Sequence, residues 1–90
     1  MYKLFIAAEF DKTLNKVATA DKRIIEKKLQ EYIAPQLKSE PHHGLNIKKL
    51  KGYSPETWRY RIGRYRMFYL IDDVEMIVSV IAIDQRKDAY

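Results

Sequence analysis

Arginines alternate with aromatic and aliphatic residues along positions 58–69, whose sequence is WRYRIGRYRMFY. This period of two predicts β-strands. The Gly63-Arg64 pair predicts a two-residue turn between two strands, because glycine adopts the positive φ that hairpin turns require. Counting outward from that turn places Arg61 directly opposite Arg66. A guanidinium offers a rigid fork of donors that matches phosphate oxygens, so the predicted chemistry is the binding of a phosphate or a similar anion.

The predicted hairpin has one basic face and one apolar face. Arg59, Arg61 and Arg66 share the basic face, although like charges opposed in a sheet are destabilising. We therefore expect these arginines to bind an anion; the alternative is a solvated face with acidic partners nearby. Glu56 is the only acidic residue between positions 42 and 66, which favours the anion site. The apolar face can anchor a core and consists of Trp58, Tyr60, Ile62, Tyr65, Met67 and Tyr69.

The elements ahead of the hairpin are predicted as one strand and two helices. The strand covers residues 2–7, which are rich in aromatic and β-branched side chains. From about Glu9 the apolar residues take helical spacing, and Thr19 or Asp21 can cap a second helix. Pro35 is expected to bend or end that second helix, with an irregular extension as the alternative. The predicted buried positions of the two helices are Phe10, Leu14, Val17, Ile25, Leu29, Tyr32 and Ile33.

The remaining elements are predicted strands joined by short turns. Residues 46–50 form one strand, the hairpin supplies two more, and residues 76–83 form a nearly all-apolar strand that belongs inside the sheet. Short connections imply antiparallel neighbours. We therefore predict one α+β domain over residues 1–90, with two N-terminal helices packed on one face of a small antiparallel β-sheet in the order β-α-α-β-β-β-β. The arginines belong on the other face.

The positive charge of the chain is concentrated in its middle. The net charge is +5, and residues 42–66 hold seven lysines and arginines against one acid, whereas the flanking segments are nearly balanced or acidic. A basic patch with interleaved aromatic residues is typical of nucleic-acid binding, and an acidic protein partner is the other possibility. The chain has no cysteine and no apolar run long enough to cross a membrane, so we expect a cytoplasmic protein without disulfides.

Two adjacent histidines invite a metal or catalytic interpretation. His42 and His43 lie in a predicted loop, where neighbouring side chains point in different directions. No aspartate, glutamate or cysteine is spaced to complete a metal site with them. We therefore expect neither histidine to have a direct chemical role.

The second half of the chain resembles the RelE branch of the RelE/ParE toxin superfamily. The resemblance rests on KKLKG at positions 48–52, the hairpin sequence at 58–69 and RKDAY at 86–90. These are similar to the basic segment, the arginine-rich hairpin and the closing tail of that family. The first half agrees with the family in its order of elements. The resemblance implies a RelE-like fold and the toxin of a type II toxin–antitoxin pair.

The resemblance also implies an activity, a set of site residues and partners. RelE-type toxins are endoribonucleases that cleave messenger RNA on the ribosome and thereby inhibit translation, and no metal or cofactor is implied. The implied partners are a RelB-like antitoxin, the ribosome and mRNA, with operator DNA reached only through the antitoxin complex. The implied catalytic residues are Arg59, Arg61, Arg66, Arg86 and Tyr90. The implied RNA- and ribosome-binding residues are Lys48, Lys49, Lys51, Arg64 and Lys87.

Metal-free RNA cleavage is compatible with these residue types. The 2′-hydroxyl of the RNA attacks the adjacent phosphate, so the enzyme must accept a proton, stabilise the phosphorane and protonate the leaving oxygen. We assign Arg61 and Arg66 to the phosphate, Arg86 to the leaving group, and Tyr90 to stacking on or orienting a base. Arginine stays protonated where some relatives have lysine, and Gln85 replaces the histidine of the family's tail. Proton removal then falls to Tyr90, to a 2′-hydroxyl held in a strong field, or to no effective group.

Two other functions are consistent with the same residues. One is a ParE-like toxin that poisons DNA gyrase, which has the same fold and a protein target. The other is a catalytically weakened toxin that acts as a binding module. The arginines in place of lysines and Gln85 in place of the tail histidine would explain the weakened catalysis. The basic tail that ends in an aromatic residue favours the nuclease.

Overall fold

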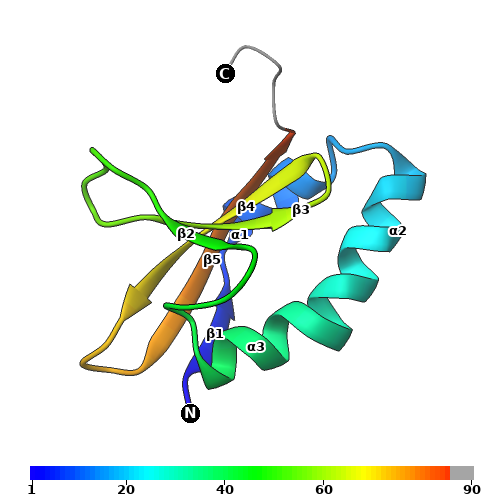
Figure 1. Ribbon diagram of the computed structural model, residues 1–90. Coiled ribbons are helices and arrows are strands. Elements are labelled where there is room, and N and C mark those ends of the chain that lie inside the picture. The colour runs from blue at the N-terminus through cyan, green and yellow to red at the C-terminus, as the bar shows by residue number, and fades with distance from the viewer. Residues whose placement is uncertain (86–90) are drawn as a thin grey trace.

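The computed structural model describes residues 1–85, in which helices cover one face of a five-stranded sheet (Figure 1). The helical elements are α1 (Ala8–Leu14), α2 (Thr19–Lys28), η1 (Leu29–Ile33) and α3 (Ala34–Ser39). The strands are β1 (Lys3–Ile6), β2 (Ile47–Lys49), β3 (Trp58–Ile62), β4 (Tyr65–Asp72) and β5 (Ile77–Gln85). The predicted α+β layout is confirmed. The predicted site residues Arg86, Lys87 and Tyr90 lie outside the described residues.

The strands lie in the order β1-β5-β4-β3-β2. The pairs β2–β3, β3–β4 and β4–β5 are antiparallel, as the short connections predicted. Strand β1 differs from the prediction of a wholly antiparallel sheet, because it pairs with β5 in parallel and makes the sheet mixed. A parallel pair needs a long crossover, and here the chain passes through all the helices and three strands before β5 returns beside β1.

The second helical segment passes through Pro35 without ending. The N–H of Ala34 bonds to the carbonyl of Leu29 five residues earlier, so η1 is a wider, π-helical turn. Proline has no N–H to continue a regular helix, and the wider turn absorbs that loss just before Pro35. The helix then continues as α3 to Ser39. The chain therefore adopts the alternative, an irregular extension beyond Pro35, and the helix does not stop there. No helix within residues 1–85 has the length and apolar character needed to cross a membrane.

The core lies between the helices and one face of the sheet. Its strand residues alternate with the arginines, so the predicted apolar face of the hairpin is confirmed as the buried face. Met67, Tyr69, Val78 and Val80 are fully buried at its centre. The helices contribute Phe10, Leu14, Ile25, Ile33 and Leu37.

Helix α1 lies against β5 and supplies a hydrogen-bond acceptor to it. The Ile83 N–H donates to the Thr13 hydroxyl oxygen over 3.0 Å, and that hydroxyl donates in turn to the Phe10 carbonyl over 3.0 Å. Strand β1 ends at Ile6, and the N–H of the next residue, Ala7, donates to the Val80 carbonyl of β5 over 2.9 Å. A side chain of α1 therefore continues the pairing of β5 where β1 has ended.

Replacing Thr13 with valine should destabilise the fold by about 1–3 kcal/mol, because the partly buried Ile83 N–H would lose its acceptor while side-chain volume is kept. Urea denaturation of the purified protein measures the change. Thr19→Val is the matched control, since Thr19 is exposed and no side-chain bond caps α2; it should stay within about 0.5 kcal/mol of the parent. Equal stability of the two variants would show that the Thr13 bond contributes nothing.

Candidate active site

The β3–β4 hairpin has the predicted turn and register. Arg61 pairs with Arg66, and Arg59 pairs with Phe68. Gly63 begins the turn at a φ of +58°, in the region that favours glycine. Alternation along both strands then puts the arginines on the face of the sheet opposite the core, which we call the open face.

The three arginines of the open face lie in different surroundings. Arg61 is exposed, and its Nε donates to the Gly63 carbonyl over 3.4 Å. Arg59 is half-buried and its Nη1 donates to the Asn46 carbonyl, also over 3.4 Å. The guanidinium of Arg66 lies 5.7 Å from the centre of the Phe68 ring, within range of a cation–π interaction. Among residues 1–85, no carboxylate forms an ion pair with Arg61, which leaves its charge available to an anion.

Strand β2 brings one of the predicted RNA-binding lysines beside the arginines. Lys48 pairs directly with Arg59, so it extends the basic row of the open face. Lys49 pairs with Trp58 instead and forms a 2.8 Å ion pair with Glu56, which takes it away from that row. Lys51 lies in the exposed turn that follows β2. Of these three lysines, the structure brings Lys48 alone to the arginine cluster.

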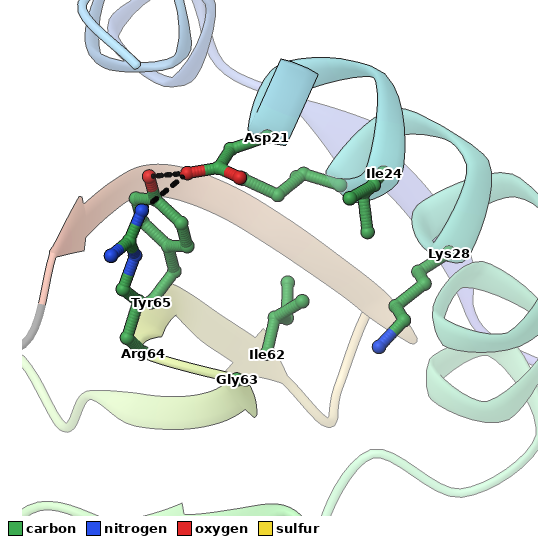
Figure 2. Close-up of a pocket in the computed structure, with 8 residues that line it drawn as sticks. Asp21, Ile24, Lys28, Ile62, Gly63, Arg64 and Tyr65 are labelled. Carbon is green, nitrogen blue, oxygen red and sulfur yellow. Dashed lines mark hydrogen bonds and ion pairs between the residues drawn. The ribbon is translucent and has the colours of Figure 1, made fainter. Parts of the chain in front are cut away.

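Arg64, another predicted RNA-binding residue, ties the hairpin turn to α2 (Figure 2). Its Nη2 lies 2.9 Å from Asp21, whose carboxylate also accepts a 2.6 Å bond from the Tyr65 hydroxyl. The Tyr65 hydroxyl and then Arg64 lower the pKa of Asp21. These side chains border a cavity of about 170 Å³ between α2 and the hairpin. Arg64 is therefore partly neutralised, in contrast with Arg61.

A second hollow borders the open face, between the C-terminal end of α1, the start of β4 and the C-terminal end of β5. This groove has a volume of about 610 Å³. Phe68 and Ala82, which pair across β4 and β5, form part of its wall, and Asp84 lies two residues further along β5 on the same face. Asp84 pairs directly with Arg66, so the row Arg61–Arg66–Asp84 crosses three strands. Lys16 and Arg64 also line the groove.

Sequence reasoning omitted three residues that the structure places at or near the site. Phe68 could have been found, because the predicted register already placed it opposite Arg59 on the basic face. Asp21 could not, because its partners Arg64 and Tyr65 lie more than forty positions away. Asp84 also could not, because its facing depends on an irregularity in β5 that has no local sequence signal.

His42 has a structural environment away from the arginine row. Its Nδ1 lies 3.0 Å from Glu40 and its Nε2 lies 3.0 Å from Asp73, which also accepts a 2.6 Å bond from the Tyr2 hydroxyl. The His42 ring is nearly perpendicular to the ring of Trp58, at the start of β3, with the ring centres 5.5 Å apart. Burial by itself lowers the pKa of His42, but the bonds to Glu40 and Asp73 outweigh it and raise that pKa. No group of three or more metal-binding side chains suited to an ion occurs within residues 1–85.

The His42 contacts predict that the protein loses stability as the pH rises. A folded-state pKa above the unfolded value of 6.5 means that the contribution is fully present below about pH 6.5 and is lost above the folded pKa. Thermal melting at about pH 5.5 and pH 8.5 should therefore show a lower midpoint at the higher pH. His42→Gln should remove most of that difference, whereas His43→Gln, at an exposed site, should keep it. A pH difference that survives in His42→Gln would contradict the assignment.

Comparison with known proteins places the chain among toxins. Residues 4–90 match the family described as the ParE toxin of the type II toxin–antitoxin system parDE. A stretch of 50 residues is 38% identical to a Methanocaldococcus jannaschii protein named "Putative toxin RelE1". That stretch covers 56% of this chain and 54% of the relative, so the match spans about half of the relative's length.

Two solved structures share the fold over nearly the whole chain. One is the toxin–antitoxin complex RelBE2 from Mycobacterium tuberculosis, at a TM-score of 0.70 and 20% identity over 94% of this chain and 98% of that one. The other is the isolated RelE toxin of E. coli, at a TM-score of 0.69 and 22% identity over 99% of this chain and 88% of that one. At sequence identities of 20% and 22%, the similarity to these two structures shows the fold alone.

Proposed function

Because this chain belongs to the RelE/ParE superfamily of toxins from type II toxin–antitoxin systems, we propose that it is a RelE-type endoribonuclease that cleaves mRNA on the ribosome. The proposal includes cleavage without a metal ion, by attack of the RNA 2′-hydroxyl on the adjacent phosphate. It also includes action in the cytoplasm and inhibition of translation as the toxic effect.

The observation that carries this proposal is the direct opposition of Arg61 and Arg66 on the open face. Two like charges across a strand pair cost stability, and a bound phosphate would offset that cost. Arg59 and Lys48 continue the basic row across β3 and β2. A row of this kind follows the phosphate backbone of a single RNA strand.

In the proposed reaction these residues act on charge and position. Arg61 and Arg66 bind the scissile phosphate and stabilise the negative charge that develops on the phosphorane; a single preorganised donor of this kind contributes about 10²–10³-fold to a rate. Phe68, beside Arg66, offers an apolar ring on which an unpaired base stacks. The roles implied for Arg86, Lys87 and Tyr90 stay predictions.

Inducible expression with mapping of RNA 5′ ends tests the proposed function. We expect induction to stop growth and to produce new 5′ ends within translated messages, and to produce none in messages that lack a start codon. New ends at equal frequency in untranslated RNA would exclude dependence on the ribosome. Growth arrest with intact messages would exclude the nuclease, and the absence of any effect would identify a weakened toxin that acts as a binding module.

The proposal includes an antitoxin as the partner of this chain. The Mycobacterium tuberculosis relative was solved as a toxin–antitoxin complex. The net charge of +5 and the basic open face suit a RelB-like antitoxin with an acidic segment and an amphipathic helix. We propose that this complex, rather than the toxin alone, carries any contact with operator DNA.

The family description itself supports a second function. The matched family is named for the ParE toxin, so a ParE-like poison of DNA gyrase is the other candidate. The same induction experiment separates the two, because a gyrase poison produces double-strand breaks in DNA and leaves messages intact. Cleaved messages with unbroken DNA decide for the nuclease.

A further inference from the structure

The proposed reaction needs a proton acceptor, and the arginines cannot supply one. A guanidinium stays protonated in proteins, and the amide of Gln85 takes no proton at neutral pH. A general base must also come within hydrogen-bond reach of the 2′-hydroxyl, beside the phosphate that this hydroxyl attacks. The acceptor should therefore lie next to Arg61 and Arg66 on the open face.

Asp84 occupies that place in the sheet. It pairs with Arg66 across β4 and β5, and Arg66 pairs with Arg61 on its other side. Side chains that oppose each other in an antiparallel pair lie about 4.5–5.5 Å apart at Cβ. The attacking 2′-oxygen lies about 3–3.5 Å from the phosphorus in a reactive geometry, so a carboxylate beside Arg66 can reach its proton.

A β-bulge turns Asp84 toward this face. Val78 and Val80 are buried against the helices, and strict alternation from them would put Ala82 and Asp84 on the same buried face. The register between β4 and β5 shifts by one residue between Phe68 and Tyr69, and beyond the shift Ile83 is the buried residue. Asp84 is consequently exposed on the open face. Bulges that redirect a side chain are frequent next to active sites.

The surroundings of Asp84 are positive. Arg66 faces it from β4, Arg64 lines the same groove from the hairpin turn, and Lys16 lines it from the segment after α1. Among the residues of positions 1–85 that line the groove, Asp84 is the only carboxylate. A negative charge weakens a site for phosphate, so its presence within the arginine row favours a chemical role over a binding role.

We propose that Asp84 is the general base of the RNA cleavage, an inference that rests on the proposed function. Its carboxylate accepts the proton of the 2′-hydroxyl as the bond from the 2′-oxygen to phosphorus forms. The bond from phosphorus to the 5′-oxygen breaks, and that oxygen takes a proton from water. The products are a 2′,3′-cyclic phosphate and a 5′-hydroxyl, and Asp84 returns its proton to solvent.

The test compares cleavage and binding by Asp84→Asn and wild-type protein on ribosomes programmed with a short message. General-base catalysis typically contributes about 10²–10⁴-fold, so the single-turnover rate should fall by that factor. Binding to a message with a 2′-O-methyl group at the cleaved nucleotide should be as tight as for the wild type or tighter, because a negative charge is removed. Asp11→Asn, an exposed position in α1, is the matched control and should change neither quantity.

The outcomes separate the two levels of the proposal. A wild-type protein that does not cleave overturns the proposed function itself. A cleaving wild type with Asp84→Asn within about threefold of its rate overturns the base assignment alone, given the factor expected of a base. A loss of rate in Asp84→Asn that follows weaker binding to the uncleavable message also overturns it, since Asp84 would then only position Arg66.

Asp84→His provides a readout that a structural role would not change. Histidine accepts a proton only in its neutral form, and it ordinarily titrates near about pH 6.5. Relative to the wild type, the cleavage rate of Asp84→His should rise with pH through about 6.5. Cleavage by Asp84→His with the same pH profile as the wild type would overturn the assignment.

Discussion

Replacing Arg66 with alanine is expected to lower the rate of mRNA cleavage by about 10²–10³-fold, the usual cost of removing one preorganised donor from a transition state. Arg66 has the central place in the open face, between Arg61 on β3 and Asp84 on β5. Arg66→Lys keeps the charge but loses the two-pronged geometry, so its rate should lie between those of the alanine variant and the wild type. Single-turnover cleavage on programmed ribosomes measures all three rates.

The same substitution should leave the fold almost unchanged. It removes a cation–π contact of about 0.5–1 kcal/mol with Phe68 and the positive charge that faces Asp84, and it also relieves repulsion between Arg66 and Arg61. Arg23→Ala, at an exposed site on α2, removes the same charge away from the open face and should cleave at the wild-type rate. Wild-type cleavage by a folded Arg66→Ala protein would contradict the assignment of the phosphate site to this face.

Replacing Tyr69 with alanine is expected to destabilise the protein by about 3–5 kcal/mol, as for other large buried aromatic residues. Tyr69 is 0% exposed at the centre of the core, and its hydroxyl donates to the Pro41 carbonyl over 2.7 Å. Domains are stable by only about 5–15 kcal/mol, so this change should leave much of the protein unfolded. Urea denaturation followed by circular dichroism measures the loss.

Tyr69→Phe separates the hydrogen bond from the packing. It should cost about 1–3 kcal/mol, because the Pro41 carbonyl would remain buried without its donor. Tyr53→Ala is the exposed control, with 57% of Tyr53 accessible, and should stay within about 0.5 kcal/mol of the wild type. If Tyr69→Phe were as unstable as Tyr69→Ala, the bond to Pro41 rather than the packing of the ring would hold this part of the core.

Local pattern was sufficient for the hairpin, because its two determinants lie close together in the chain. The alternation of side chains assigns each residue to a face, and the turn at Gly63 sets the register. A one-residue shift in the register of a strand would turn its arginines toward the core, where their charges would be buried. The same logic located the helices, although it did not foresee that a π-turn carries the helix past Pro35.

Contacts between distant residues were beyond such patterns. The parallel pairing of β1 with β5, the bond from Ile83 to Thr13 and the contacts of Asp21 with Arg64 each join residues more than forty positions apart. Neither partner carries a signal of the other, because each contact depends on how complete elements pack. The lysines of β2 show the same limit, since the register with β3 decides that Lys48 joins the arginines and Lys49 does not.

By itself the sequence determined the basic face of the hairpin and the α+β layout that presents it, because periodicity and turn residues act over a few positions. Only the tertiary structure decided what stands beside Arg66. The bulge between β4 and β5 reverses the facing of every later residue of β5, and it brings Asp84 to the open face while Ile83 enters the core. A change of facing that depends on the pairing of two strands cannot be read from either strand alone.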